Sequence, residues 1–351
     1  MQIGKIKQPP PYHLRHNKAV DRFLLVELLK RLDRVEHDFT ENACYCGFGG
    51  PYLEDIRLIH ENFPKMRLCS VEIDQSVLDR QKFLAPCKGI ELIPGDYKSI
   101  FDKHSDIFDS NAVVWLDYIG FEPRVIEDFT TTINTFQRTS VLRVTVEADY
   151  EKYKRKKYKG DSKSNPFDKF RENFGDFFPA SMDNEPKDDN EFVGLVREIL
   201  LKAAYQVLPT SSGSAFVPIM STFYSDSTIM YSLTGIVYVT KNPLSLAEVR
   251  DRVNSSLSQW DFANELKCED KTPIIIDLPY LTTKERLHLQ KFLPCNEKDD
   301  PGEILFKELK YAITTKLETQ TQNENDEQTK NLLRSYAKFY RYYPYVIRGN
   351  P

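Results

Sequence analysis

Short apolar segments alternate with amphipathic segments over the first 150 residues of this chain. Apolar runs of four to eight residues bounded by turn residues predict strands, and apolar residues repeating every three to four positions predict helices. On this pattern we predict strands at 42–46, 67–73, 90–93, 112–116 and 140–146, and helices at 18–32, 52–62, 75–83 and 122–136. Regular alternation of this kind is typical of a parallel sheet with helical crossovers.

The alternation stops near residue 150. The segment 150–190 is rich in charge, and we interpret it as an inserted, partly irregular segment. A helix is predicted at 192–205, followed by two β-rich runs, 216–224 and 228–240, whose connection Ser225-Asp226-Ser227 predicts a hairpin. Beyond Pro243 the pattern predicts helices at 245–257, 282–292, 303–317 and 331–340, with one short strand at 274–276.

These elements predict an α/β fold with a doubly wound, seven-stranded, mostly parallel sheet, an antiparallel terminal hairpin and a C-terminal helical region. We predict an N-terminal arm and helix over 1–39, a ligand-binding domain over 40–240 that carries the charged insertion 150–190, and a mainly helical region over 241–351. The arm could act as a lid over the site.

Composition narrows the class of protein. The chain has 351 residues, 40% of them hydrophobic, and a net charge of −4, so it can bury a core and is not basic overall. Nucleic-acid binding is therefore not favoured. We find no apolar run long enough for a membrane span, no signal peptide, and no Cys/His spacing typical of zinc, so we expect no bound metal and a cytoplasmic protein with reduced thiols.

A glycine-rich turn joins the first predicted strand to the helix after it, and reads Cys46-Gly47-Phe48-Gly49-Gly50. Glycines there let a ligand approach the backbone, and the helix start favours anionic groups. A tight strand-to-helix turn without a ligand would look the same. The next strand ends in Glu72-Ile73, where an acid can accept hydrogen bonds from ribose hydroxyls, so we predict a nucleotide-type ligand.

Two more predicted strands end in acidic residues. Asp96, followed by Tyr97, could bond the amino group of an adenine, although Asp96 after Gly95 could equally be a turn residue. Asp117, followed by Tyr118, emerges from a strand that is apolar throughout. Because ligands bind at the carboxyl ends of parallel strands, we expect Asp117 at the site rather than serving only as an exposed helix cap.

With four strand ends in register, the segment 40–240 resembles the class I S-adenosylmethionine-dependent methyltransferases. The resemblance rests on the glycine turn, Glu72, Asp96 and Asp117-Tyr118, together with the terminal hairpin. In particular the chain is similar to a bacterial group labelled "putative O-methyltransferases" and, more loosely, to the three-Cys-motif partner proteins. The resemblance implies S-adenosylmethionine as cofactor, bound by Cys46, Gly47, Phe48, Gly49, Glu72, Ile73, Asp96, Tyr97 and Asp117.

For the chemistry, the resemblance implies in-line transfer of a methyl group to an oxygen or nitrogen nucleophile of unknown identity. Asp117 is the candidate base, assisted by Tyr118, while His13 could close over the cofactor and Arg15 meet its carboxylate. The segment 12–18 could equally be a solvated arm. The fourth motif, Asp-Tyr-Ile-Gly, lacks the two prolines of enzymes that methylate base amines, which disfavours that chemistry.

Several alternatives stay open at this point. The lysine-rich run 152–159 could contact nucleic acid, but a solvated face is the commoner explanation. The aromatic tail after Lys338 could pack on the body or on a protein partner. The whole chain could also be a binding or partner protein that keeps the fold with little activity. A nicotinamide-dependent oxidoreductase is disfavoured by the hairpin and by Pro51-Tyr52-Leu53, which stands where a third spaced glycine is needed.

Overall fold

The computed structural model describes residues 15–33, 39–155, 165–182, 184–208, 214–226, 228–239, 246–258, 260, 262, 273–314 and 321–344. The chain divides into two compact units. The larger comprises Leu24–Phe223 and Ser227–Ile274, and the smaller comprises Met1–Phe23, Tyr224–Asp226 and Ile275–Pro351. The predicted domain limits, 39 and 240, follow the order of elements along the chain and stay a prediction.

The described strands form one eight-stranded sheet with the order β3-β2-β1-β4-β5-β7-β6-β8. Their bounds are β1 Cys44–Gly47, β2 Arg67–Glu72, β3 Glu91–Pro94, β4 Ala112–Asp117, β5 Ser140–Glu147, β6 Ser214–Ser225, β7 Ile229–Val239 and β8 Ile274–Ile276. The first five pair in parallel, and β7 pairs with β5 antiparallel, with Ser140 opposite Val237. The predicted mostly parallel α/β fold is confirmed, and β8 makes the sheet one strand larger than predicted.

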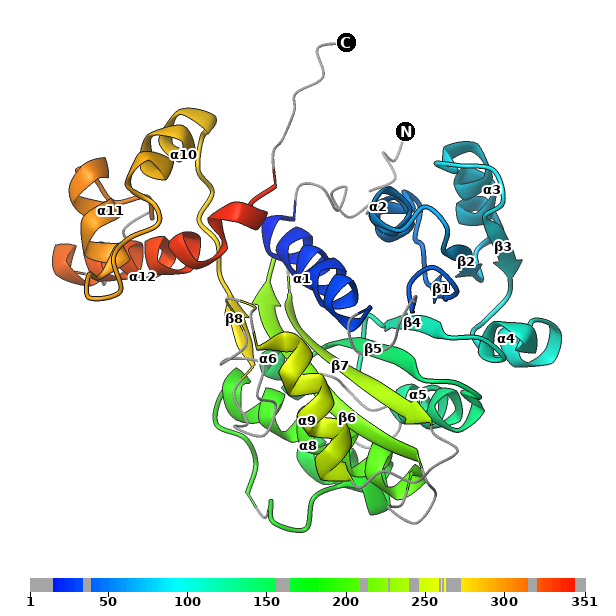
Figure 1. Ribbon diagram of the computed structural model, residues 1–351. Coiled ribbons are helices and arrows are strands. Elements are labelled where there is room, and N and C mark those ends of the chain that lie inside the picture. Colours follow the sequence, from blue (N-terminus) through cyan, green and yellow to red (C-terminus); the bar gives the residue numbers. More distant parts are fainter. Residues whose placement is uncertain are drawn as a thin grey trace, which may run out of the picture. The chain divides into compact units, whose positions relative to one another are not determined.

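The strand order reverses at β1 and β4, which is the defining feature of a doubly wound sheet. Helices α4 (Lys98–Lys103), α5 (Pro123–Thr135) and α8 (Asp189–Val207) share one core with the sheet, which includes Cys46, Val114 and Leu116. Side chains of a strand alternate between the two faces, so Tyr45, Val113 and Trp115 point to the opposite face. Figure 1 shows α5 and α8 on one side of the sheet, away from α2 (Glu54–Asn62) and α3 (Gln75–Leu84).

The second face of the sheet carries polar groups that are fully buried. Trp115 Nε1 donates to Thr145 Oγ1 at 2.9 Å, and that hydroxyl is 2.7 Å from Ser232 Oγ. Arg143 donates to Thr234 Oγ1 at 2.9 Å and lies over the Trp115 ring, 4.7 Å from its centroid. Because a buried polar group is costly unless it is bonded, these contacts tie β4, β5 and β7 in one register.

The larger unit also contains α1 from Leu24 onward (whole helix His16–Leu32) and α9 (Leu246–Leu257), together with short helices in the charged insertion. Three of these are α6 (Tyr150–Lys154), α7 (Pro166–Phe174) and a 3-10 turn (Gly175–Phe177). Phe167, Phe170 and Phe174 are buried at helical spacing. The prediction of a partly irregular insertion therefore missed a helix, because charged residues between those phenylalanines hid its apolar face.

The smaller unit contains α10 (Thr283–Leu289), α11 (Pro301–Leu309) and α12 (Gln322–Phe339). The prediction placed the last helix at 331–340 after a polar linker, and the structure starts it nine residues earlier with a capping box between Thr321 and Glu324. Asn325 and Thr329 form the buried face of its first half and bond Thr314. The first half of α12 was interpreted as a polar linker because the buried face of that half carries polar residues. Helix α11 is shorter than predicted because Lys310 adopts a left-handed conformation.

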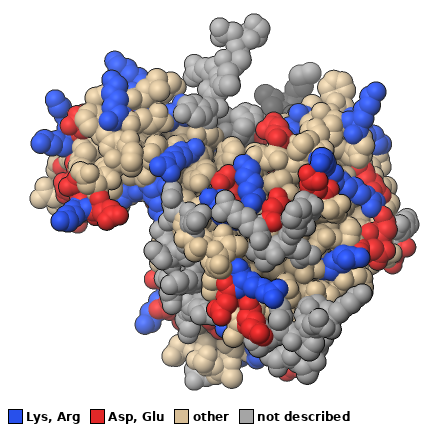
Figure 2. Space-filling view, in the orientation of Figure 1, with Lys and Arg blue, Asp and Glu red and all other residues tan. Residues whose placement is uncertain are grey.

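Among the residues that the structure describes, no helix is long and apolar enough to cross a membrane. On the face drawn in Figure 2, Lys and Arg side chains are interspersed with Asp and Glu rather than gathered into one basic area. The described residues also include no group of three or more His, Cys, Asp or Glu placed to hold a metal ion.

Candidate functional site

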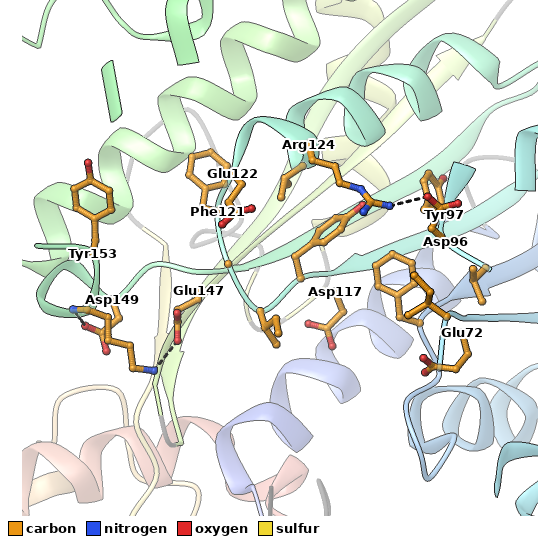
Figure 3. A pocket seen from close by; sticks show the side chains of 18 of the residues that line it. Glu72, Asp96, Tyr97, Asp117, Phe121, Glu122, Arg124, Glu147, Asp149 and Tyr153 are labelled. Carbon is orange, nitrogen blue, oxygen red and sulfur yellow. Dashed lines mark hydrogen bonds and ion pairs between the residues drawn. The ribbon is translucent and has the colours of Figure 1, made fainter. Parts of the chain in front are cut away.

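A cavity of about 910 Å³ lies in the larger unit at the carboxyl ends of the parallel strands. The residues that follow β1, β2, β3, β4 and β5 all contribute to its wall. Figure 3 shows Asp117 with Glu72 to one side and Glu147 to the other, as the strand order requires. This edge of a doubly wound sheet is where ligands bind, because strand ends and the loops after them can be varied without disturbing the core.

At the end of β2, Glu72 and Ile73 both line the cavity. Glu72 Oε1 accepts a hydrogen bond from the Asp74 backbone N–H at 2.9 Å, which orients the carboxylate. Ile73 is 75% exposed. Its predicted contact with the cofactor stays a prediction.

At the end of β3, Asp96 lines the cavity and is held from two directions. Ser99 Oγ donates to Asp96 Oδ1 at 3.2 Å, and Arg124 of α5 donates to Oδ2 at 3.1 Å. The preceding Gly95 has φ +134°, a conformation that side chains disfavour, and its N–H donates to Glu72 O at 3.0 Å. The turn thus brings the ends of β2 and β3 together. Tyr97 also lines the cavity, but its hydroxyl lies 2.7 Å from Thr132 Oγ1 inside the core.

At the end of β4, Asp117 and Tyr118 line the cavity. The Tyr118 hydroxyl donates to Asp128 Oδ2 at 2.5 Å, and burial together with this bond raises the pKa of Tyr118. A phenol so placed is a structural donor rather than a base, so of the two predicted catalytic residues on this strand Asp117 is the better placed. Asp128 is almost fully buried, and Arg124 Nε lies 3.6 Å from it.

The glycine-rich turn follows β1, and its predicted role in holding the cofactor stays a prediction. Of its residues only Phe48 belongs to the cavity wall, where its ring packs edge-on against Tyr118 at 5.3 Å. A Cβ on Gly49 would lie 2.5 Å from Ser70 Oγ, and a Cβ on Gly47 would lie 2.9 Å from the Tyr45 hydroxyl. Cys46 points into the core, where burial raises the pKa of its thiol. These three residues allow close packing behind the cavity.

Sequence reasoning predicted Asp117 and Tyr118 but missed Phe121 and the part of the wall at and after the end of β5. Glu147 ends β5, and its Oε1 accepts bonds from Lys152 Nζ at 2.7 Å and Thr228 Oγ1 at 2.6 Å. Asp149 caps the N-terminus of α6, and Phe121 and Tyr153 add aromatic surface. Glu147 is the acid that ends β5, as Asp117 ends β4, and an acid at a predicted strand end is the signal that could have found it. Lys152 and Arg155 line the cavity, although the lysine run was interpreted as a solvated face.

A family model described as "Putative O-methyltransferase" matches residues 10–350 of the chain. This protein belongs to that family. The predicted enzyme class, a methyltransferase, is thereby confirmed at the level of the family, and S-adenosylmethionine as the predicted cofactor agrees with the family and the fold.

Two predicted residues of this methyltransferase lie elsewhere in the chain. His13 falls outside the described residues, and Arg15 belongs to the smaller unit. Next to it, His16 packs between Tyr280 and Tyr343, with ring centroids 5.0 Å from each. Burial lowers the pKa of His16. The predicted lid role of this segment stays a prediction.

No curated protein matches the chain. Among solved structures, it is similar to a Methanococcus jannaschii fibrillarin pre-rRNA processing protein, at 12% identity and a TM-score of 0.35 over 57% of this chain and 69% of that one. It is also similar to the plantazolicin methyltransferase BamL, at 10% identity and a TM-score of 0.35 over 65% and 97% of the two chains. A Staphylococcus aureus structure titled "putative caffeoyl-CoA O-methyltransferase" follows, at 11% identity, a TM-score of 0.32, and 60% and 83% coverage.

Proposed function

We propose that the cavity binds S-adenosylmethionine and that the enzyme transfers its methyl group to an oxygen or nitrogen nucleophile. One observation carries this proposal: Glu72 and Asp117 end two strands of the parallel sheet, Asp96 lies two residues beyond the end of a third, and all three line the same cavity. Pockets for single ligands usually enclose about 300–1,000 Å³. A cavity of about 910 Å³ is at the upper end of that range, so it can hold a cofactor together with an acceptor.

The residues after β1, β2 and β3 fit the cofactor. The Glu72 carboxylate is an acceptor for ribose hydroxyls, and the Asp96 carboxylate is an acceptor for the adenine amino group. Ile73 and Phe48 supply apolar surface on which a base can rest. When bound, S-adenosylmethionine supplies an electrophilic methyl group on a sulfonium. The cation would be favoured by this wall, which carries six carboxylates and three cationic side chains.

The residues after β4 and β5 form the acceptor side. Asp117 is placed between the two sides, and we assign it the proton from the acceptor hydroxyl or amine. Proton removal by a positioned carboxylate leaves a lone pair for attack on the methyl group. The side chains of Phe121 and Tyr153 exclude water and hold the nucleophile of the acceptor in line with the methyl group. Binding energy is thereby used to orient the reacting atoms, which lowers the barrier to transfer.

Calorimetry with the purified full chain tests the cofactor assignment. S-adenosylmethionine and its demethylated product should bind with micromolar affinity, and NAD should not bind. Glu72→Gln should weaken both sulfur compounds by about tenfold because a charged acceptor to two hydroxyls is lost. Glu54→Gln, on α2 and absent from the cavity wall, is the matched control. No binding of either sulfur compound at millimolar concentration would contradict the proposal.

The alternative function, a partner or binding protein that keeps the cofactor pocket, predicts a different combination of results. Both sulfur compounds would bind, yet no acceptor would be methylated in a mixture of small molecules, proteins and nucleic acids incubated with labelled cofactor. Label in any acceptor, lost in Asp117→Asn, supports the enzyme.

A further inference from the structure

The acceptor side of the cavity has walls of a particular kind. Three aromatic side chains line it, Phe121 from the loop after β4, Tyr153 from α6 and Phe192 from α8. None of the three adjoins the acids at the ends of β2 and β3 in sequence. Tyr153 lies in the charged insertion 150–190, Phe121 precedes the insertion, and Phe192 follows it. The aromatic walls are therefore supplied by segments after β4 and not by the ends of β2 and β3.

Neighbouring rings hold each of these aromatic walls in place. Phe121 stacks on Phe174, with centroids 4.6 Å apart and planes 16° from parallel. Tyr153 packs edge-on against Phe170 at 4.9 Å and stacks on Phe192 at 5.2 Å. Rings fixed in this way lose little further entropy when a ligand binds, and their flat faces favour a flat partner.

The Tyr153 hydroxyl is turned away from any role at the reacting atoms, because it donates to the backbone carbonyl of Pro166 in α7. What Tyr153 offers to the cavity is its ring. The same holds for Phe121 and Phe192, so the recognition available on these walls is apolar and aromatic.

Charge on the acceptor side is negative in balance. Asp117, Glu122, Glu147 and Asp149 line it, against Lys152 and Arg155. Lys152 is already engaged by Glu147 at 2.7 Å and by Thr228 at 2.8 Å, so its charge is partly compensated before any ligand enters. A carboxylate or phosphate on the acceptor would meet unfavourable potential there, whereas a neutral or cationic acceptor would not.

Resting on the proposed function, we infer that the methyl acceptor is a flat aromatic hydroxyl compound that carries no negative charge. The ring lies between the walls of Phe121 and Tyr153, and its hydroxyl faces Asp117. In the reaction the O–H proton passes to the Asp117 carboxylate, a carbon–oxygen bond forms to the methyl group, and the sulfonium carbon–sulfur bond breaks to leave a neutral thioether.

Four probe compounds of similar size distinguish the effect of an aromatic ring on binding from the effect of the probe's charge. Tyramine, 4-ethylphenol, 3-(4-hydroxyphenyl)propionate and 4-ethylcyclohexanol are titrated into the full chain saturated with the demethylated cofactor, and methyl transfer from labelled cofactor is followed in parallel. Tyramine and 4-ethylphenol should bind at least about tenfold more tightly than the propionate or the cyclohexanol, as expected from ring stacking and charge. The two phenols should also be methylated.

Substitutions in the cavity wall test whether Tyr153 and Phe121 are the residues that bind the phenol ring. Tyr153→Ala should weaken phenol binding about tenfold while Tyr153→Phe does not, because only the ring faces the cavity. Phe121→Ala should act like Tyr153→Ala, and Tyr311→Ala, an exposed tyrosine of the smaller unit, should change nothing. Glu147→Gln should narrow the difference in affinity between tyramine and the propionate, because it removes one negative charge from the wall.

The outcomes distinguish this inference from the proposed function beneath it. Loss of cofactor binding in the unmodified protein contradicts the proposed function itself. Normal binding of the demethylated cofactor overturns the inference alone if the propionate or the cyclohexanol binds as well as the phenols, or if no phenol binds at millimolar concentration. Equal phenol binding by Tyr153→Ala and the unmodified protein overturns it as well.

Discussion

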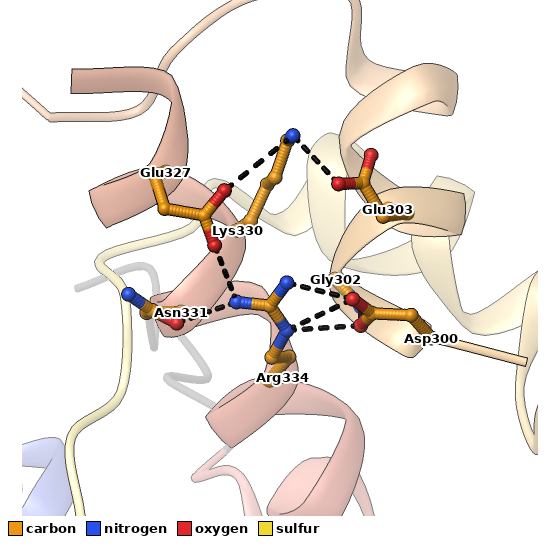
Figure 4. Close-up of polar contacts among 7 residues, drawn as sticks. All are labelled: Asp300, Gly302, Glu303, Glu327, Lys330, Asn331 and Arg334. Atoms are coloured by element: carbon orange, nitrogen blue, oxygen red, sulfur yellow. Dashed lines mark hydrogen bonds and ion pairs between the residues drawn. The ribbon is translucent and has the colours of Figure 1, made fainter. Parts of the chain in front are cut away.

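Arg334 and Arg124 each contact two carboxylates, and the surroundings of these two arginines differ. Arg334 on α12 donates to Asp300 at 2.6 Å and to Glu327 at 2.8 Å, with about a third of its side chain exposed (Figure 4). Arg124 on α5 joins Asp96 of the cavity wall at 3.1 Å to the buried Asp128 at 3.6 Å. Arg124 is itself about half exposed, so the two sets differ in the carboxylates: all partners of Arg334 are exposed, whereas Asp128 is buried in the core.

The comparison shows that ion pairs alone do not identify a site. The Arg334 cluster has shorter distances and more partners, which sequence spacing on helices can produce anywhere. Water competes for exposed pairs, so their net contribution is small. At the cavity, the buried Asp128 fixes Arg124 and Tyr118 from below, and the groups above it are left to face a ligand. The buried carboxylate of Asp128 therefore distinguishes the contacts of Arg124, which position groups at the cavity, from the contacts of Arg334, which only join two helices at the surface.

The largest effect is expected for Asp117 at the end of β4, and it is expected on the rate of methyl transfer. Asp117→Asn should lower the methyl-transfer rate by about a hundredfold or more, since a positioned base contributes that much, and cofactor affinity should stay within about threefold. Single-turnover transfer and calorimetry measure the two. Glu127→Gln, an exposed acid of α5 outside the cavity wall, is the control. A large loss of cofactor affinity in Asp117→Asn would make Asp117 a binding residue.

Next comes the packing that shapes the cavity edge. Gly49→Ala should reduce the free energy of unfolding by about 1–3 kcal/mol, because overpacking forces neighbours apart. The new Cβ would lie 2.5 Å from both Leu53 Cδ2 and Ser70 Oγ. Gly120→Ala at the cavity rim meets nothing within 4 Å and should be close to neutral. Urea denaturation compares them. Equal stability of the two variants would argue against this explanation of the glycine-rich turn.

Substitution of the buried Asp128 tests the difference between the contacts of Arg124 and those of Arg334. Asp128→Asn should cost about 1–3 kcal/mol of stability, because the Tyr118 hydroxyl and Arg124 lose a charged acceptor. It should also raise the KM for S-adenosylmethionine several-fold while kcat changes little, since Arg124 no longer holds Asp96 as firmly. Tyr118→Phe removes only the phenol contact and should spare the KM. Unchanged KM in Asp128→Asn would confine this residue to stability.

The smallest effect is expected at the exposed cluster. Arg334→Ala should cost less than about 1 kcal/mol and leave transfer unchanged. Arg334 lowers the pKa of Asp300, so the pair stabilises the fold above the unfolded value near 4 and loses that contribution as pH falls through the lower folded value. Thermal unfolding at pH 7 and pH 3 should therefore show the gap between Arg334→Ala and the unmodified protein shrinking in acid. A gap that grew in acid would reverse the assigned sign.

Local pattern was sufficient for most of the sheet and for several acids of the site. Apolar strands followed by polar residues predicted β1 to β7 and brought Glu72, Asp96 and Asp117 to one edge, because parallel strands deliver their carboxyl ends to the same side. The same pattern was wrong for the start of α12. Its buried face carries Asn325 and Thr329, whose burial depends on Thr314, a partner outside the helix.

By itself, then, the amino-acid sequence determined the α/β class, the glycine-rich turn and the line of acids, since each follows from periodicity within one element and the residue that ends it. Only the tertiary structure decided which side chains face the cavity. It turned Cys46, Gly47 and Gly49 to the packing behind the site, committed Tyr118 to Asp128, and brought Glu147, Phe121 and Tyr153 to the acceptor side. These outcomes depend on which side chains of different segments meet in space, and the periodicity within one element does not specify that.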